Sequence, residues 1–281
     1  GATGAVVFGL ISAAAWGTGD FGGGLASRRA PVFGVVLISQ FVGMAMAFAL
    51  AVVRVEGPPS VTDLGWSVAG GVAGGIGIAS LYRALAVGRM AVVAPVTAVL
   101  AASIPVVVGF VLDGLPDPVV MVGMGLAIVA VVLVSRVEDG SGGRSRGLGL
   151  ALVAGVGFGL FGVCIGQLSA GHGFGPLALV RATEAVMIGG VVLVTRSPWR
   201  PPRDLVLAIC AVGVMDMVGN GAYILAVQAG SLAVAAVLSS LYPVTTVILA
   251  TIVLRERVTR DHVVGIGLAA TAIVLIGLGS A

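Results

Sequence analysis

Three polar side chains recur one turn apart in an otherwise apolar stretch of the second half of the chain. Asp216, Asn220 and Tyr223 stand at i, i+4 and i+7, so a helix would carry all three on one face. A carboxylate, an amide and a phenol on one face could bind a polar solute, accept a proton, or join helices through hydrogen bonds. We favour solute or proton binding, and structural bonding stays the alternative.

A charged pair lies in a neighbouring apolar stretch. Arg181 and Glu184 stand at i and i+3, a spacing that lets opposite charges meet on one helix face. Pairing would neutralise two charges that are costly to bury, so the pattern predicts a structural ion pair. If Glu184 had no partner, burial would favour its protonated form and make it, like Asp216, a candidate for proton coupling.

A third set of side chains lies near the start of the chain. Ser12, Trp16 and Asp20 repeat every four residues, which again indicates one helix face. Aromatic rings with a few polar anchors are typical of small-molecule sites. The candidate substrate-binding residues are Trp16, Asp20, Tyr82, Phe158, Asp216, Asn220, Tyr223 and Tyr242.

Two ionisable side chains lie near the ends of their apolar runs. Asp20 and Arg83 are both close enough to a run's end for the charged group to reach the aqueous interface. We therefore favour an interfacial position for both of them, and a position facing a cavity or a partner stays the alternative.

The composition places these polar groups in a membrane protein. Of 281 residues, 58% are hydrophobic and 10% are charged, whereas a soluble domain has about 45–50% apolar and about 25% charged residues. The net charge is +3, but all fifteen basic residues are arginines and most lie in short connections between apolar runs. That distribution is typical of membrane orientation and argues against a nucleic-acid partner.

Ten apolar runs fill nearly the whole chain. A membrane-crossing helix needs roughly 20 predominantly apolar residues, and each run meets or approaches that length. The runs cover residues 3–23, 33–53, 65–87, 90–111, 117–135, 147–168, 175–195, 205–227, 231–254 and 260–279. The predicted fold class is an all-α membrane protein with ten transmembrane helices.

The first five runs align with the last five after a shift of 142 residues. The shift pairs residues 16–17 (WG) with 158–159 (FG), and residues 123–127 (GMGLA) with 265–269 (GIGLA). Five is an odd number, so the second repeat would enter the membrane upside down, as in many secondary transporters. The predicted units are a first repeat at 1–135, a linker at 136–146 and a second repeat at 147–281.

Residues for enzymatic chemistry do not come together in the sequence. His172 and His262 are far apart, and Cys164 and Cys210 each lie in an apolar run without a second ligand nearby. We recognise no metal cluster, nucleophile with its base, or phosphate-binding glycine loop. The chain is therefore expected to be no enzyme and to hold neither metal nor cofactor.

Short motifs add to this reading. They are the WG at 16–17 with its FG counterpart, GNGAYILAVQAG at 219–230, and the segment 240–268, which begins SLYPV, contains LRERVT and ends GIGL. These motifs and the duplication resemble the EamA family of the drug/metabolite transporter superfamily.

The resemblance implies ten helices in two inverted repeats around a central cavity, in the cell (inner) membrane. It implies a carrier, often an exporter, of amino acids or related metabolites, with protons as a further partner where transport is coupled. The expected partners are a small-molecule substrate and lipids, and the chain would act as a monomer or homodimer. Uptake, exchange of cations or lipid-linked sugars, and a non-transporting membrane enzyme or scaffold remain alternatives.

One loop departs from the family pattern. The family's loop glutamate corresponds to Glu256 in the second repeat, whereas the first repeat has Gly114 at the aligned position. Because Glu256 stands between Arg255 and Arg257, we expect it to form a structural ion pair or a helix cap.

Arginines are concentrated in alternate loops. The loops after the first, third, fifth, seventh and ninth runs hold twelve, and the other loops hold only Arg54. The positive-inside rule then places the arginine-rich loops in the cytoplasm and both termini outside. The family resemblance implies the opposite, with both termini in the cytoplasm, so the two orientations stay open.

Overall fold

The structure is a computed structural model of the chain. It describes residues 2–113, 118–135, 147–169, 173–229, 238–239, 241–256 and 260–279. Within these residues the chain forms helices and no strands. The helices are α1 (Ala2–Ala26), α2 (Val32–Val53), α3 (Val61–Val87), α4 (Met90–Asp113), α5 (Pro118–Ser135), α6 (Leu148–Gly166), α7 (Phe174–Thr195), α8 (Arg203–Ala229), α10 (Tyr242–Val253) and α11 (Arg260–Gly279).

The predicted all-α class is confirmed for the described residues, and each predicted run overlaps one of these helices. The ninth run was predicted at 231–254; residues 231–237 and 240 lie outside the described residues, and the described helix α10 covers Tyr242–Val253. Pro243 lies in the first turn of α10, where its missing N–H breaks no helical hydrogen bond. The predicted linker, 136–146, lies outside the described residues.

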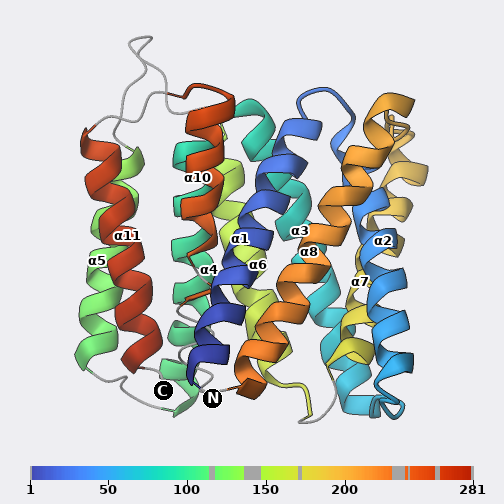
Figure 1. The fold of residues 1–281 in the computed structure, drawn as a ribbon, viewed down its shortest axis with the longest axis horizontal. Helices are drawn as coiled ribbons and strands as arrows, with labels where there is room; N and C mark the ends of the chain where they lie inside the picture. Colours follow the sequence, from blue (N-terminus) through green and yellow to red (C-terminus); the bar gives the residue numbers. More distant parts are fainter. Residues whose placement is uncertain are drawn as a thin grey trace.

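The helices stand side by side, with the α5–α11 pair at one edge and α2 and α7 at the other (Figure 1). Between these edges α1 packs against α8 and α10, and α6 packs against α3 and α4. The start of α1 and the end of α11 lie at the same end of the helices (Figure 1). The turn between α1 and α2 and the turn between α3 and α4 lie at the opposite end, because successive helices alternate in direction.

The outside of the protein is apolar. Large hydrophobic side chains such as Phe48, Leu193 and Leu207 are 64–81% exposed, which suits contact with lipid rather than water. Among the described residues, five helices are long and apolar enough to cross a membrane, namely α2, α3, α6, α7 and α8. Arg83 is exposed on α3, and its interfacial position stays a prediction.

Glycines bring the helices close together. In α6, a Cβ at Gly155 or Gly159 would lie 2.5 Å from the Cβ of Leu100 or Ile104 in α4. In α3, a Cβ at Gly71 would lie 2.8 Å from the carbonyl oxygen of Val180 in α7. Small residues permit such backbone contact in lipid, where hydrophobic burial does not drive helices together.

Two loop glutamates bind the first turns of distant helices. Glu256 accepts hydrogen bonds from the amides of Met90 (3.3 Å) and Ala91 (3.2 Å) at the start of α4, and Arg28 lies 3.5 Å from its carboxylate. The expected cap and ion pair of Glu256 are therefore both confirmed. Glu56, which the sequence reading did not single out, caps α7 in the same way.

Glu56 binds three successive amides, those of Gly173 (3.3 Å), Phe174 (3.0 Å) and Gly175 (2.8 Å). These N–H groups have no partner inside helix α7, and the helix dipole adds attraction for a carboxylate. Replacing Glu56 by alanine should lower the free energy of unfolding by roughly 1–2 kcal/mol, measured by thermal unfolding in detergent. Glu56→Gln keeps an acceptor oxygen and should lose less; equal losses for both variants would contradict the capping role.

Candidate functional site

Arg181 of α7 joins three helices through its guanidinium. Its Nη1 donates to the carboxylate of Glu184 at 3.1 Å and to the side-chain oxygen of Gln40 in α2 at 2.9 Å. Its Nη2 donates to the carboxylate of Asp216 in α8. The pair predicted within α7 is thus part of a larger cluster that also ties α7 to α2 and α8.

The members of this cluster differ in burial. The side chains of Arg181 and Glu184 are 8% and 3% exposed, whereas that of Asp216 is 29% exposed. A solute or a proton would therefore reach Asp216 more easily than it would reach Glu184. Asp216 is also the carboxylate partner that belongs to a different helix from Arg181.

Asn220 holds Asp216 from one turn away. Its amide nitrogen donates to the backbone oxygen of Asp216 at 2.8 Å and to the carboxylate at 3.4 Å. The spacing of these residues on α8 thus produces the shared face that the sequence predicts. The Asn220 amide thus makes one of its hydrogen bonds to the backbone of its own helix, in keeping with the structural alternative for Asn220.

Three aromatic rings meet beside this face. The ring centroid of Trp16 in α1 lies 5.8 Å from that of Tyr223 in α8 and 6.4 Å from that of Tyr242 in α10, the latter edge to face. Both distances are in the range of favourable aromatic pairs. Trp16 can approach α8 because Gly219 has no side chain; a Cβ there would overlap the indole.

Asp20 points into the protein, so its expected interfacial position is wrong. It is half-buried, and its carboxylate lies within electrostatic range of Asp216, Tyr82 and Tyr242. The reason is the rotation of α1. The face that presents Trp16 to α8 and α10 also presents Asp20, one turn later, and contact with those helices outweighs the nearness of the helix end.

The ring of Tyr82 reaches this region from α3. It lies directly over Gly23 of α1, where a Cβ would overlap the ring, and only 2% of the residue is exposed. Phe158, in contrast, is not brought to the three rings. It packs over Gly77 of α3 and against the main apolar core, which is the packing role that a lone membrane aromatic often has.

Gln40 is the one member of the Arg181 cluster that the sequence reading missed. It is 3% exposed in α2 and is the only amide side chain of that helix. A search for ionisable groups passes over a neutral amide. A buried amide in an apolar helix needs a partner nonetheless, and that requirement is the signal that could have found it.

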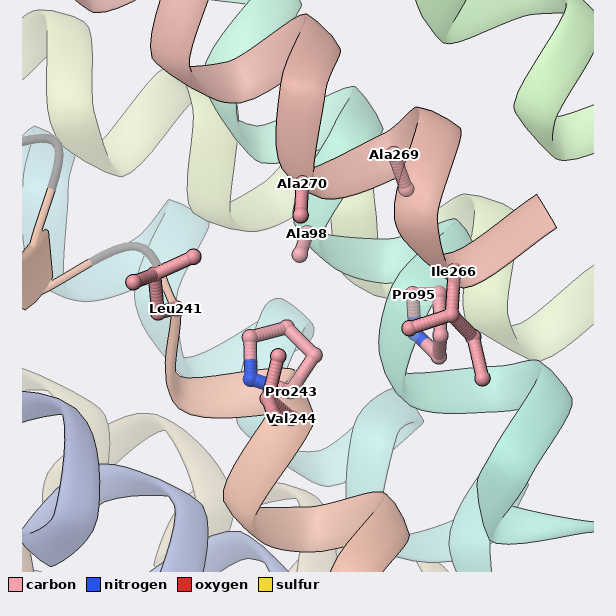
Figure 2. A pocket seen from close by; sticks show the side chains of 8 residues that line it. All are labelled: Pro95, Ala98, Leu241, Pro243, Val244, Ile266, Ala269 and Ala270. Atoms are coloured by element: carbon pink, nitrogen blue, oxygen red, sulfur yellow. The ribbon is translucent and has the colours of Figure 1, made fainter. Parts of the chain in front are cut away.

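A small pocket between α4, α10 and α11 is separate from these polar groups. Figure 2 shows its lining, which is apolar: Pro95, Ala98, Leu241, Pro243, Val244, Ile266, Ala269 and Ala270. It contains none of the predicted binding residues. Within the part of the chain that the structure describes, no group of three or more His, Cys, Asp or Glu side chains could hold a metal ion.

Comparisons with known proteins connect this arrangement to a family. The sequence model of the EamA-like transporter family matches residues 145–278, a stretch that contains Arg181, Glu184 and Asp216. A solved structure described as "Crystal structure of protein" has a TM-score of 0.66 and 17% sequence identity, covering 98% of this chain and 97% of the other. At that identity the likeness concerns the fold alone. No curated protein matches the chain significantly.

Proposed function

We propose that this chain, whose residues 145–278 match the sequence model of the EamA-like transporter family, part of the drug/metabolite transporter superfamily, is a secondary transporter. We propose that it exports a small metabolite, such as an amino acid, by alternating access across the cell (inner) membrane. It acts as a monomer or homodimer and uses no cofactor. The observation that carries the proposal is the Arg181 cluster, which joins α2, α7 and α8 beside the side chains of Asp20 and Trp16.

Helix contacts support an inverted duplication of residues 1–135 and 147–281. Contacts recur when each helix of the first five is exchanged for its counterpart among the last five. The α1–α8 contact matches α3–α6, α3–α7 matches α2–α8, and α4–α6 matches α1–α10. Two symmetry-related halves can open alternately toward either side of a membrane around one site.

Asp216 is the exchangeable partner of Arg181 in this mechanism. Arg181 and Glu184 lie on the same helix, so their contact persists when α7 moves as a rigid body. The contact between Arg181 and Asp216 joins two helices and must change if α7 and α8 move apart. A proton or a polar substrate group bound at Asp216 would weaken that contact, which links binding to the movement.

Transport by purified protein in liposomes tests this role of Asp216. A panel of metabolites should reveal flux driven by a proton gradient. Asp216→Asn should remove the pH dependence of that flux, because a side-chain amide does not bind a proton near neutral pH as a carboxylate can. Asp204, exposed in the first turn of α8, supplies the matched control Asp204→Asn, which should behave as the parent protein. An unchanged pH profile in Asp216→Asn would exclude that residue from coupling and leave Glu184 as the candidate.

Orientation gives a separate prediction. Since twelve arginines lie in alternate loops, we propose that this arginine-rich end faces the cytoplasm and that both termini lie outside. Compartment-sensitive reporters fused to each terminus should give no cytoplasmic signal. Cytoplasmic signals from both fusions would support the family's usual orientation instead.

A further inference from the structure

We propose that the connection between α7 and α8 binds the headgroup of an anionic phospholipid. Residues 196–203 (RSPWRPPR) carry Arg196, Arg200 and Arg203, with one aromatic side chain, Trp199, between them. This lipid site does not depend on the proposed transport and uses none of the residues of the Arg181 cluster.

The connection lies at a membrane boundary and at the outer edge of the protein. Both α7 and α8 are long and apolar enough to cross a membrane, so the segment that joins them must lie where the hydrocarbon ends. Figure 1 shows α7 beside α2 at one edge of the helices. Leu193 and Val194, just before the connection, and Leu207, just after it, are 80–85% exposed. Lipid molecules can therefore reach the connection from the side.

The three arginines carry positive charge that the described residues do not neutralise. All three are exposed, and within the described part of the chain none of them forms an ion pair with a carboxylate. Three arginines and Asp204 give residues 196–204 a net charge of +2. Basic side chains at a membrane surface attract anionic lipids, so this charge favours a lipid with a net negative headgroup.

The backbone of the connection is held in one shape. Arg196 ends α7 in the left-handed conformation, with a φ of 52°. Three prolines restrict the residues that follow. The carbonyl oxygen of Trp199 lies so close to Gly34 of α2 that a Cβ there would overlap it. A backbone that is already ordered loses little conformational entropy when a ligand binds.

Arg200 and Trp199 form a unit that suits a phosphate at the edge of the hydrocarbon. The guanidinium carbon of Arg200 lies 5.5 Å from the centre of the Trp199 ring, a cation–π distance. A guanidinium group that stacks in this way keeps its N–H donors for a phosphate, which arginine can bind through two parallel hydrogen bonds. Trp199 is 41% exposed, and tryptophan is enriched at the level of the lipid headgroups.

Two other ligands that carry a phosphate fit less well. A zwitterionic lipid such as phosphatidylcholine would bring its own cation next to the three arginines. A soluble phosphate ester has no acyl chain to contact the exposed side chains of Leu193 and Val194. The expected order of affinity is therefore phosphatidylglycerol, then phosphatidylcholine, with glycerol phosphate the weakest.

Native mass spectrometry of the purified protein in non-ionic detergent tests this order, with phosphatidylglycerol and phosphatidylcholine of the same acyl chains as probes. The anionic lipid should bind at least roughly tenfold more tightly than the zwitterionic one, since each basic side chain near an anionic headgroup contributes roughly fivefold. Replacing Arg196, Arg200 and Arg203 together by glutamine should lower the affinity for phosphatidylglycerol by at least roughly tenfold. Raising the ammonium acetate concentration from about 0.05 to about 0.5 M should remove the preference of the parent protein, because salt screens exposed charges.

A second triple variant is the matched control. Arg83, Arg255 and Arg260 are exposed arginines of the same arginine-rich end but belong to α3 and to the connection between α10 and α11. Their replacement by glutamine removes the same charge and should leave the affinity for phosphatidylglycerol within about twofold of the parent value.

Three results would overturn the proposal. Equal losses of affinity in the two triple variants would mean that the whole arginine-rich end attracts lipid without a site. Glycerol phosphate that binds as tightly as phosphatidylglycerol would mean a site for a soluble anion. A preference for phosphatidylglycerol that survives high salt in the parent protein would exclude the exposed arginines as its cause, even if the triple variant of residues 196–203 failed to fold.

Discussion

Replacing Arg181 by leucine is expected to lower the free energy of unfolding by about 3–5 kcal/mol, the range for removing one partner of a buried ion pair. The variant leaves the carboxylate of Glu184, only 3% exposed, without its cation. Asp216 loses its ion pair as well and keeps the hydrogen bond from the Asn220 amide. Gln40, 3% exposed, loses the donor to its side-chain oxygen.

A second variant tests whether the loss of stability comes from the unpaired carboxylate of Glu184 or from the changed shape of the side chain at position 181. Glu184→Gln combined with Arg181→Leu removes the buried carboxylate together with the cation, so it should recover a large part of the loss. Arg83→Leu, on an exposed arginine of α3, is the control and should change stability little. The measurement is thermal or denaturant unfolding in detergent. If the double variant were no more stable than Arg181→Leu, orphaned charge would not be the cause.

Gly34→Ala should be the second most damaging change, at about 1–3 kcal/mol. Gly34 lies in the first turn of α2, where the connection between α7 and α8 passes over it. A Cβ at this position would overlap the carbonyl oxygen of Trp199. A backbone oxygen cannot swing aside as the end of a side chain can, so the whole connection or the start of α2 must move.

A glycine with free space around it, in another helix, provides the control for Gly34→Ala. Gly65 of α3 has no atom within 4 Å of the position that a Cβ would occupy, so Gly65→Ala should stabilise the helix by up to about 1 kcal/mol. The two alanine variants are then expected to shift the melting temperature in opposite directions. If both variants shifted the melting temperature in the same direction, helix propensity, and not the contact with Trp199, would dominate at Gly34.

The helices themselves could be predicted closely from the sequence. The largest difference at a helix start, apart from α10, is in α3, where the predicted run begins at residue 65 and the helix begins at Val61. Ser60 and Asp63 form a reciprocal capping box there. A scan for apolar runs misses polar first turns, although the S-x-x-D spacing is itself a helix-start signal.

The candidate site could be predicted only in part. Residues three or four apart on one helix are neighbours whatever the rest of the protein does, which is why Arg181 meets Glu184 and why Asn220 meets Asp216. The contact between Arg181 and Asp216 and the contact with Gln40 depend on how α2, α7 and α8 pack. No local pattern specifies them.

The sequence by itself determined that this protein is a bundle of apolar helices and which polar side chains share a helix face, because composition and the 3.6-residue period are local properties. Only the tertiary structure decided that Asp216 shares Arg181 with Glu184, that Trp16 lies against Tyr223 and Tyr242, and that Asp20 points inward. Those outcomes follow from the rotation of each helix about its axis. Glycine contacts between segments far apart in the chain set that rotation, at Gly219 against Trp16 and at Gly23 against Tyr82.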